Sequence, residues 1–226
     1  MKISNFELPD SGLVLIAGRP GIGKSYVVLE MANDLNQKGI KPVLLYADGQ
    51  KSHSSCHYEN GVVRESPSKL SRVKKVYPDL PYIVEDYAAH YFFLQWEVLI
   101  KNIIEFEHPK VIFINALVHP SKSITGNILK HLQNIAKKND ILIIAESQVS
   151  RNVERRKDCH PGVNDIKCNP KALRFVDQCV FVYRDSYYTQ NEGEEHSKIE
   201  VYSAEQMISI PFDIQKIFCI KTCTAL

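Results

Sequence analysis

Short apolar runs alternate with amphipathic segments along most of the chain. Five of these runs predict buried strands, at residues 13–17, 43–47, 82–84, 111–114 and 141–145. Apolar residues at helical spacing predict helices between the runs, including one that ends at Gly39 and one over about 91–106. Strands that alternate with helices predict an α/β fold, with a mostly parallel sheet flanked by helices on both faces.

Beyond Gln178 the pattern changes to close-set strands separated by turns. These predicted strands cover residues 179–183, 199–202, 208–210 and 218–220. They predict an antiparallel C-terminal edge on the sheet. Residues 50–81 are polar and predict a loop with a solvated helix. Because no repeat or long linker divides the sequence, we expect one domain over residues 1–226.

Charge and hydropathy limit the classes of partner. The chain has 28 Lys and Arg residues against 26 Asp and Glu, so its net charge of +2 does not indicate a polyanion over the whole surface. Any nucleic-acid site must therefore be local. No apolar run approaches the roughly 18 residues that span a bilayer, and the N-terminus lacks the pattern of a signal peptide. We expect a cytoplasmic protein without a membrane partner.

A glycine-rich turn follows the first buried strand and precedes the first helix. Its residues are Gly18, Arg19, Pro20, Gly21, Ile22, Gly23, Lys24 and Ser25. This is the phosphate-loop pattern in the context that gives it meaning. Glycines let backbone N–H groups surround phosphates, Lys24 reaches the terminal phosphates, and the Ser25 hydroxyl can ligate a divalent cation. The turn predicts a site for a nucleoside triphosphate, ATP with Mg²⁺.

Two positions at strand ends bear on hydrolysis. An acidic residue that holds Mg²⁺ is expected after the strand at 111–114, but this strand ends in Asn115. An amide carries no charge, so we expect weaker Mg²⁺ binding there. Asp48 follows the second strand and is the nearest carboxylate that could polarise an attacking water. An ordinary turn residue in Asp48-Gly49 explains it equally well.

Two segments carry a resemblance to a known family. Residues 147–158 read SQVSRNVERRKD and residues 182–188 read VYRDSYY. Together with the Arg19-Pro20 dipeptide, they resemble the C-terminal motor domain of DnaB-type replicative helicases, without an obvious gap from 132 to 188. The resemblance implies a RecA-like P-loop NTPase fold, movement along single-stranded DNA driven by ATP, and a hexameric ring.

Several functional residues carry over from that family. Gln148 matches the strand-end glutamine that senses the terminal phosphate, a role that suits an amide. Asp165-Ile166-Lys167 resembles part of a DNA-contacting loop, in which Lys167 keeps the charge for a phosphate contact. The following Cys168-Asn169-Pro170 departs from the family pattern. Nearby lies a basic cluster that suits either a DNA backbone or a solvated surface, formed by Arg151, Arg155, Arg156 and Lys157.

The departures from the family concern catalysis. Asn115 replaces the metal-binding Asp, and Asp48 or Gly49 stands where the catalytic Glu is expected. The late hairpin at 202–206 lacks the Lys and Arg that would reach a neighbouring subunit's ATP site. The chain begins close to its first strand, so we expect the family's N-terminal domain to be missing.

Two functions are compatible with these matches and departures. The first is a DnaB-like helicase or translocase that acts on single-stranded DNA in replication, as a homo-oligomer. The second is a catalytically degenerate ATP-binding module that assembles with a replication helicase or another replication partner and regulates it. A small-molecule kinase is disfavoured because it gives residues 147–158 and 182–188 no role.

Overall fold

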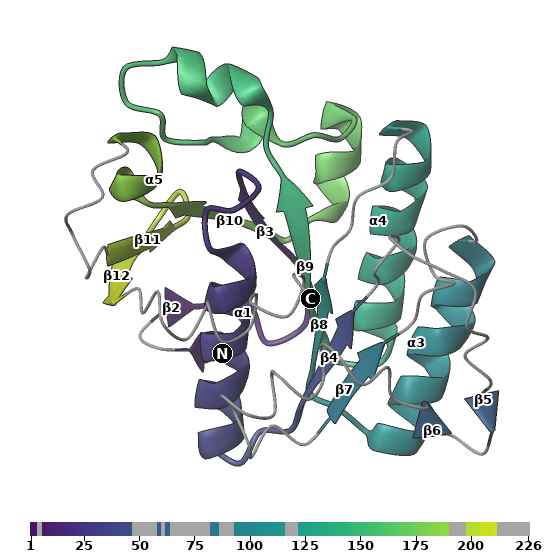
Figure 1. Cartoon of the computed structure of the whole chain (residues 1–226). Coiled ribbons are helices and arrows are strands. Elements are labelled where there is room, and N and C mark those ends of the chain that lie inside the picture. Colours follow the sequence, from purple (N-terminus) through teal and green to yellow (C-terminus); the bar gives the residue numbers. More distant parts are fainter. Residues whose placement is uncertain are drawn as a thin grey trace, which may run out of the picture.

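The computed structural model describes residues 1–3, 6–46, 58–59, 62–63, 82–85, 93–115, 122–189 and 198–211. Its main feature is a sheet of eight strands, at whose centre lies the strand that precedes the glycine-rich turn (Figure 1). The strands are β3 (Gly12–Gly18), β4 (Pro42–Tyr46), β7 (Tyr82–Glu85), β8 (Val111–Asn115), β9 (Leu142–Gln148), β10 (Gln178–Tyr183), β11 (Lys198–Tyr202) and β12 (Met207–Pro211). In space their order is β12-β11-β10-β3-β9-β8-β4-β7.

The sheet is mixed in the way that the sequence pattern predicts. Six neighbouring strands, from β10 to β7 in the spatial order, are parallel to one another. The antiparallel edge consists of β11, which pairs with β10, and β12, which pairs with β11. The α/β fold with an antiparallel C-terminal edge is thereby confirmed. The structure adds that β10 itself belongs to the parallel part of the sheet.

Helices cover both faces of the sheet, and each face has its own core. Figure 1 shows α1 (Lys24–Gln37) on one side and α3 (Phe93–Glu107) with α4 (Lys122–Lys138) on the other. Val28 of α1 shares a buried cluster with Ile16, whereas Leu129 of α4 shares another with Leu15. Successive strand side chains point to opposite faces, so neighbouring residues of β3 supply both cores.

The end of α1 follows from a glycine, as predicted. Gly39 has a φ of 74°, in the left-handed region that a residue without Cβ adopts at little cost. The N–H of the next residue, Ile40, donates to the carbonyl of Leu35 at 3.0 Å. This bond is typical of a glycine-terminated helix, and it turns the chain back toward β4.

Shorter elements complete the described structure. They are the strand pairs β1 (Lys2–Ile3) with β2 (Phe6–Glu7) and β5 (Tyr58–Glu59) with β6 (Val62–Val63), the 3-10 helices η1 (Arg151–Arg155), η2 (Val163–Asp165) and η3 (Pro170–Phe175), and the short helix α5 (Asp185–Thr189). Most of residues 50–81, the turn at Asp48-Gly49 and the predicted strand at 218–220 lie outside the described residues. Within the described ranges, no helix is both long and apolar enough to cross a membrane.

The segment that joins β9 to β10 lies at the carboxyl ends of the parallel strands. In Figure 1 it forms the green cap above the arrowhead of β9. The segment returns to β9, because Val149 forms an isolated antiparallel bridge with Ile166 and the N–H of Lys167 donates to the carbonyl of Gln148 at 2.9 Å. Ligands of open α/β sheets bind at this edge. The η1–η3 segment lies there close to the glycine-rich turn, because Arg19 of the turn contacts Glu154 and Val149.

Candidate nucleotide-binding site

The glycine-rich turn connects the end of β3 at Gly18 to the start of α1 at Lys24. Gly21 and Gly23 have φ values of 82° and 117°, which L side chains rarely adopt. Ile22 between them is fully buried and fixes the turn to the core below α1. The resulting backbone presents the N-terminus of a 14-residue helix at the carboxyl edge of the sheet, where an anion is electrostatically favoured.

Lys24 is held inside this turn. Its Nζ donates to the carbonyl oxygens of Gly18 at 3.2 Å and of Arg19 at 3.0 Å, and the residue is only 9% exposed. Burial lowers the pKa of Lys24, while the nearby Glu146 favours its charged form. The turn therefore contains a positive charge that is little screened by solvent, as a site for polyphosphate requires.

Arg19 has a different environment from Lys24. Its Nε donates to a carboxylate oxygen of Glu154 in η1 at 2.6 Å, and its Nη1 donates to the carbonyl of Val149 at 3.1 Å. Arg19 is 5% exposed, so it forms a buried connection between the glycine-rich turn and the segment after β9. Arg184, which follows β10, donates from its Nη2 to the Gly21 carbonyl of the turn at 3.4 Å.

Three side chains meet beside the start of α1. The Ser25 hydroxyl donates to one carboxylate oxygen of Glu146 at 3.1 Å. The Asn115 amide donates to the other oxygen of Glu146 at 2.7 Å and to the Ser25 oxygen at 3.0 Å. Ser25, Asn115 and Glu146, which come from α1, β8 and β9, therefore form a closed hydrogen-bonded triangle.

Sequence reasoning missed Glu146. It lies within β9, which the apolar pattern ended at Ala145 but which continues to Gln148. Glu146 is 3% exposed, and this burial raises its pKa to about 7, although Lys24 and the Ser25 hydrogen bond act in the opposite direction. The available signal was a carboxylate in an otherwise uncharged buried strand, two residues before Gln148 and hence on the same face of the sheet.

The structure brings Gln148 next to the glycine-rich turn. In the parallel pairing of β3 and β9, Gln148 is the register partner of Gly18. The N–H of Val149 also donates to the Gly18 carbonyl at 3.3 Å. Gln148 thus ends its strand beside the place where the turn begins, as a phosphate-sensing residue would. The other predicted catalytic residue, Asp48, lies outside the described residues.

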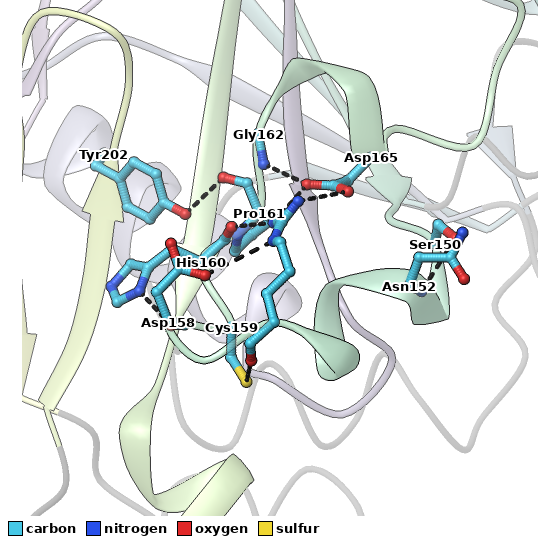
Figure 2. Close-up of polar contacts among 10 residues, drawn as sticks. Ser150, Asn152, Asp158, Cys159, His160, Pro161, Gly162, Asp165 and Tyr202 are labelled. Atoms are coloured by element: carbon cyan, nitrogen blue, oxygen red, sulfur yellow. Dashed lines mark hydrogen bonds and ion pairs between the residues drawn. The ribbon is translucent and has the colours of Figure 1, made fainter.

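The predicted DNA-binding residues differ in what they contact. Arg151, Arg155 and Lys167 are exposed. Arg156 is exposed as well, but its guanidinium makes two bonds to the Asp165 carboxylate, at 3.1 Å from Nη1 and 2.8 Å from Nη2. Figure 2 labels Asp165 and marks the bonds at its carboxylate with dashed lines. Arg156 therefore has a structural partner, and the backbone of Lys167 is hydrogen-bonded to Gln148.

The Arg156–Asp165 pair belongs to a wider network within the segment (Figure 2). Asp165 also accepts the N–H of Gly162 at 2.8 Å, and Arg156 donates to the carbonyl of His160. The Tyr202 hydroxyl of β11 donates to the Pro161 carbonyl at 2.7 Å. These bonds close residues 156–165 into a compact loop and attach it to the edge of the sheet.

The late hairpin lies on the other side of β10 from β3. Its turn is tied to β2, because the Gln206 side chain accepts the N–H of Glu7 at 2.8 Å and donates to the Glu7 carbonyl at 2.7 Å. The residues between β11 and β12 are Ser203, Ala204, Glu205 and Gln206, without a basic side chain. This turn therefore offers no cation to a neighbouring nucleotide site.

The site suits a hard divalent cation together with polyphosphate. Ser25 and Glu146 provide a hydroxyl and a carboxylate oxygen, the donor types that Mg²⁺ prefers, beside the positive end of α1. Among the described residues, no group of three or more His, Cys, Asp or Glu side chains could hold a metal ion by itself. A cation here would thus share its ligands with a bound phosphate.

The mostly parallel sheet with helices on both faces is the RecA-like fold that the sequence predicts. Solved structures agree: one solved ATPase domain superposes with a TM-score of 0.63 at 19% identity, over 91% of this chain and 82% of that one. A chain from "The Structure Of A DnaB-Like Replicative Helicase And Its Interactions With Primase" also gives 0.63 at 19% identity, over 89% of this chain and 56% of that one. These likenesses show the fold.

The resemblance to DnaB-type replicative helicases is confirmed by sequence comparison. Residues 107–210 match the family model of the DnaB-like helicase C terminal domain. The probable replicative DNA helicase of Trieres chinensis is 25% identical over 87% of this chain and 49% of its own length. The replicative DNA helicase DnaC of Bacillus subtilis is 38% identical over 36% of this chain and 18% of its own. The Trieres relative and others like it are about twice as long as the part that this chain matches.

Proposed function

We propose that this chain is an ATP-binding motor domain of the DnaB-like type, which acts on single-stranded DNA during replication in the cytoplasm. The observation that carries the proposal is the position of Gln148. Its strand end adjoins the glycine-rich turn at Gly18, and its carbonyl accepts the N–H of Lys167 from the predicted DNA loop. A candidate nucleotide sensor and a candidate DNA contact are thus held together by a backbone hydrogen bond.

The nucleotide is proposed to be ATP with Mg²⁺, bound over residues Gly18 to Ser25. Lys24 supplies a buried positive charge for the phosphates, and the N-terminus of α1 supplies backbone donors. Bound Mg²⁺ would neutralise part of the phosphate charge. The chain's own contribution is to hold the phosphates, orient the Ser25 hydroxyl and place the Gln148 amide at the strand end.

DNA is proposed to contact Arg151, Arg155 and Lys167. All three are exposed at the carboxyl edge of the sheet and carry the charge that a phosphate backbone requires. We also propose that copies of this chain assemble into a ring, as the family resemblance implies. Size-exclusion chromatography with light scattering, with and without ATP, tests this assembly, and a monomer under both conditions would contradict it.

A second candidate function is an ATP-binding module that regulates, or assembles with, an active helicase or another replication protein. Two observations favour it. Asn115 occupies the end of β8 where a metal-binding carboxylate is expected, and the turn at 203–206 has no basic side chain. Under this alternative, nucleotide binding persists but turnover depends on a partner that supplies the missing cation.

Steady-state ATP hydrolysis with Mg²⁺, measured with and without single-stranded DNA, separates the two functions. Lys24→Ala is the blank, because it removes the charge that meets the phosphates. Turnover above this blank that DNA stimulates supports the motor. Nucleotide binding without turnover supports the partner-dependent module. Unchanged ATP affinity in Lys24→Ala would contradict the site itself.

A further inference from the structure

We propose that Glu146 supplies the carboxylate that holds the nucleotide-bound divalent cation, a role that the end of β8 cannot fill because Asn115 is uncharged. This inference rests on the proposed ATP site and assigns a residue within it. It moves the acidic group from the expected strand, β8, to its neighbour β9, one position closer to β3 in the sheet.

Glu146 lies beside the hydroxyl that would bind the cation. The Ser25 hydroxyl is the expected cation ligand of the glycine-rich turn, and it donates to the Glu146 carboxylate at 3.1 Å. Asn115 contacts the same hydroxyl at 3.0 Å, so the two strands converge on one point. A carboxylate on β9 therefore reaches the position that a residue at the end of β8 also reaches.

Two hydrogen-bond donors fix the orientation of the Glu146 carboxylate. The Asn115 amide donates to the Glu146 oxygen that Ser25 does not contact, at 2.7 Å. Each carboxylate oxygen thus has its own donor, and the plane of the carboxylate is fixed. Outer hydrogen bonds of this kind orient metal-binding carboxylates. Asn115 therefore acts as a positioning residue, and it explains why an amide, rather than a second acid, stands at the end of β8.

The burial of Glu146 has an energetic cost. A carboxylate that is 3% exposed loses most of its hydration, and its two donors, Ser25 and Asn115, are both uncharged. Such burial destabilises the folded protein unless a cation is nearby. Lys24 is one positive charge in this region, and a divalent ion at Ser25 would be another. Costly buried acids occur mainly at functional sites.

The test compares ATP affinity in Mg²⁺ with ATP affinity in EDTA, by calorimetry, for the parent chain and Glu146→Gln. Glutamine keeps the shape of the side chain and removes its charge. We expect the magnesium-dependent gain in affinity to fall by about 10- to 100-fold, with the affinity in EDTA unchanged or tighter. An equal change under both conditions, or an unchanged gain from Mg²⁺, would overturn the assignment.

A carboxylate exchange provides the second measurement. Asn115→Asp alone places two acids against each other and should weaken the fold without nucleotide. Combined with Glu146→Gln, it returns a single acid to the site and should restore the gain from Mg²⁺. Electron paramagnetic resonance with ATP should show the same pattern, in which Mn²⁺ binding is weaker in Glu146→Gln and is restored in the double variant. Failure of the exchange to restore cation binding, when the double variant unfolds at the parent temperature, would contradict the proposal.

Failure of the underlying function has a different signature. If the parent chain binds ATP in neither Mg²⁺ nor EDTA, the proposed nucleotide site is wrong and the assignment of Glu146 is wrong with it. If Glu146→Gln loses hydrolysis while its gain in affinity from Mg²⁺ is preserved, the ATP site stands. The carboxylate then acts on the reaction rather than on the cation, and this assignment is overturned.

Discussion

The Arg19 side chain of the glycine-rich turn forms an ion pair of 2.6 Å with Glu154 of η1. The side chain of Arg19 is 6% exposed and that of Glu154 is 38% exposed, so the pair extends from the core to the surface. Arg19 is also anchored by the carbonyl of Val149. A displacement of the turn would therefore act directly on the segment that carries the candidate DNA contacts.

This connection predicts that Glu154→Gln uncouples the two sites. Removing the charge leaves Arg19 bonded to Val149, so ATP affinity should change by less than about twofold, while stimulation of hydrolysis by DNA should fall by about 2- to 10-fold. Titration of turnover with single-stranded DNA measures the effect. Glu205→Gln, an exposed carboxylate in the β11–β12 turn, is the control. Equal stimulation in both variants would exclude this coupling route.

Lys167→Ala should weaken binding to single-stranded DNA and lower its salt dependence. Each lost phosphate contact reduces the slope of log affinity against log salt by about 0.7. Fluorescence anisotropy with a labelled oligonucleotide at several salt concentrations provides the measurement. Lys101→Ala serves as the control, because Lys101 lies on α3, away from the η1–η3 segment in Figure 1. Parallel salt curves for the parent and Lys167→Ala would remove this residue from the interface.

Arg156 should behave differently from Lys167, because its charge is used inside the segment. Asp165→Ala removes both guanidinium bonds and the bond to Gly162. We expect unfolding stability to fall by about 2 kcal/mol, since bonds to charged groups are worth about 1.5–3 kcal/mol each and some are replaced by water. Urea denaturation and proteolysis of residues 151–165 measure the loss. A double-mutant cycle with Arg156→Ala should show coupling; strictly additive effects would contradict the pairing.

Glu146 predicts the sign of a pH effect on the protein without nucleotide. Burial raises its pKa from 4.5 to about 7, so between these values the folded state binds more protons than the unfolded state. The contribution of Glu146 to the free energy of unfolding is therefore largest below its pKa in the unfolded state. This contribution is lost as the pH rises to about 7, by at most about 1.4 kcal/mol per pH unit. Urea denaturation at pH 5, 6 and 7 should show this slope in the parent and less of it in Glu146→Gln. The predicted sign would be contradicted if the free energy of unfolding of the parent rose with pH relative to that of Glu146→Gln.

The fold could be predicted because its signals are local. The apolar runs before Gly18 and Asn115 become β3 and β8, and Gly39 ends α1 where its conformational freedom indicates. The glycine-rich turn is also contiguous, so its residues could be named as a candidate site before any contact was known. These features depend on neighbours within a few residues.

The rest of the site depends on residues that are far apart in the sequence. The Glu146 carboxylate contacts Ser25 and Asn115 because β9 lies between β3 and β8. The strand pattern alone gives no such neighbours. Likewise, Arg151 and Arg156 look equivalent in the sequence. Only the fold shows that the guanidinium of Arg156 is hydrogen-bonded to the Asp165 carboxylate. The strand order and the contact between Arg156 and Asp165 depend on the tertiary structure, which local sequence patterns do not specify.

The position of β3 at the centre of the sheet also has a consequence for synthesis. The strand before the glycine-rich turn pairs with residues 142–148 on one side and 178–181 on the other. Both partners follow it by more than a hundred residues, and such long-range pairing forms late. During translation, the turn therefore leaves the ribosome long before β9 and β10, which flank β3, have been made. The proposed ATP site should therefore form only after residues 142–181 have been made and have paired with β3.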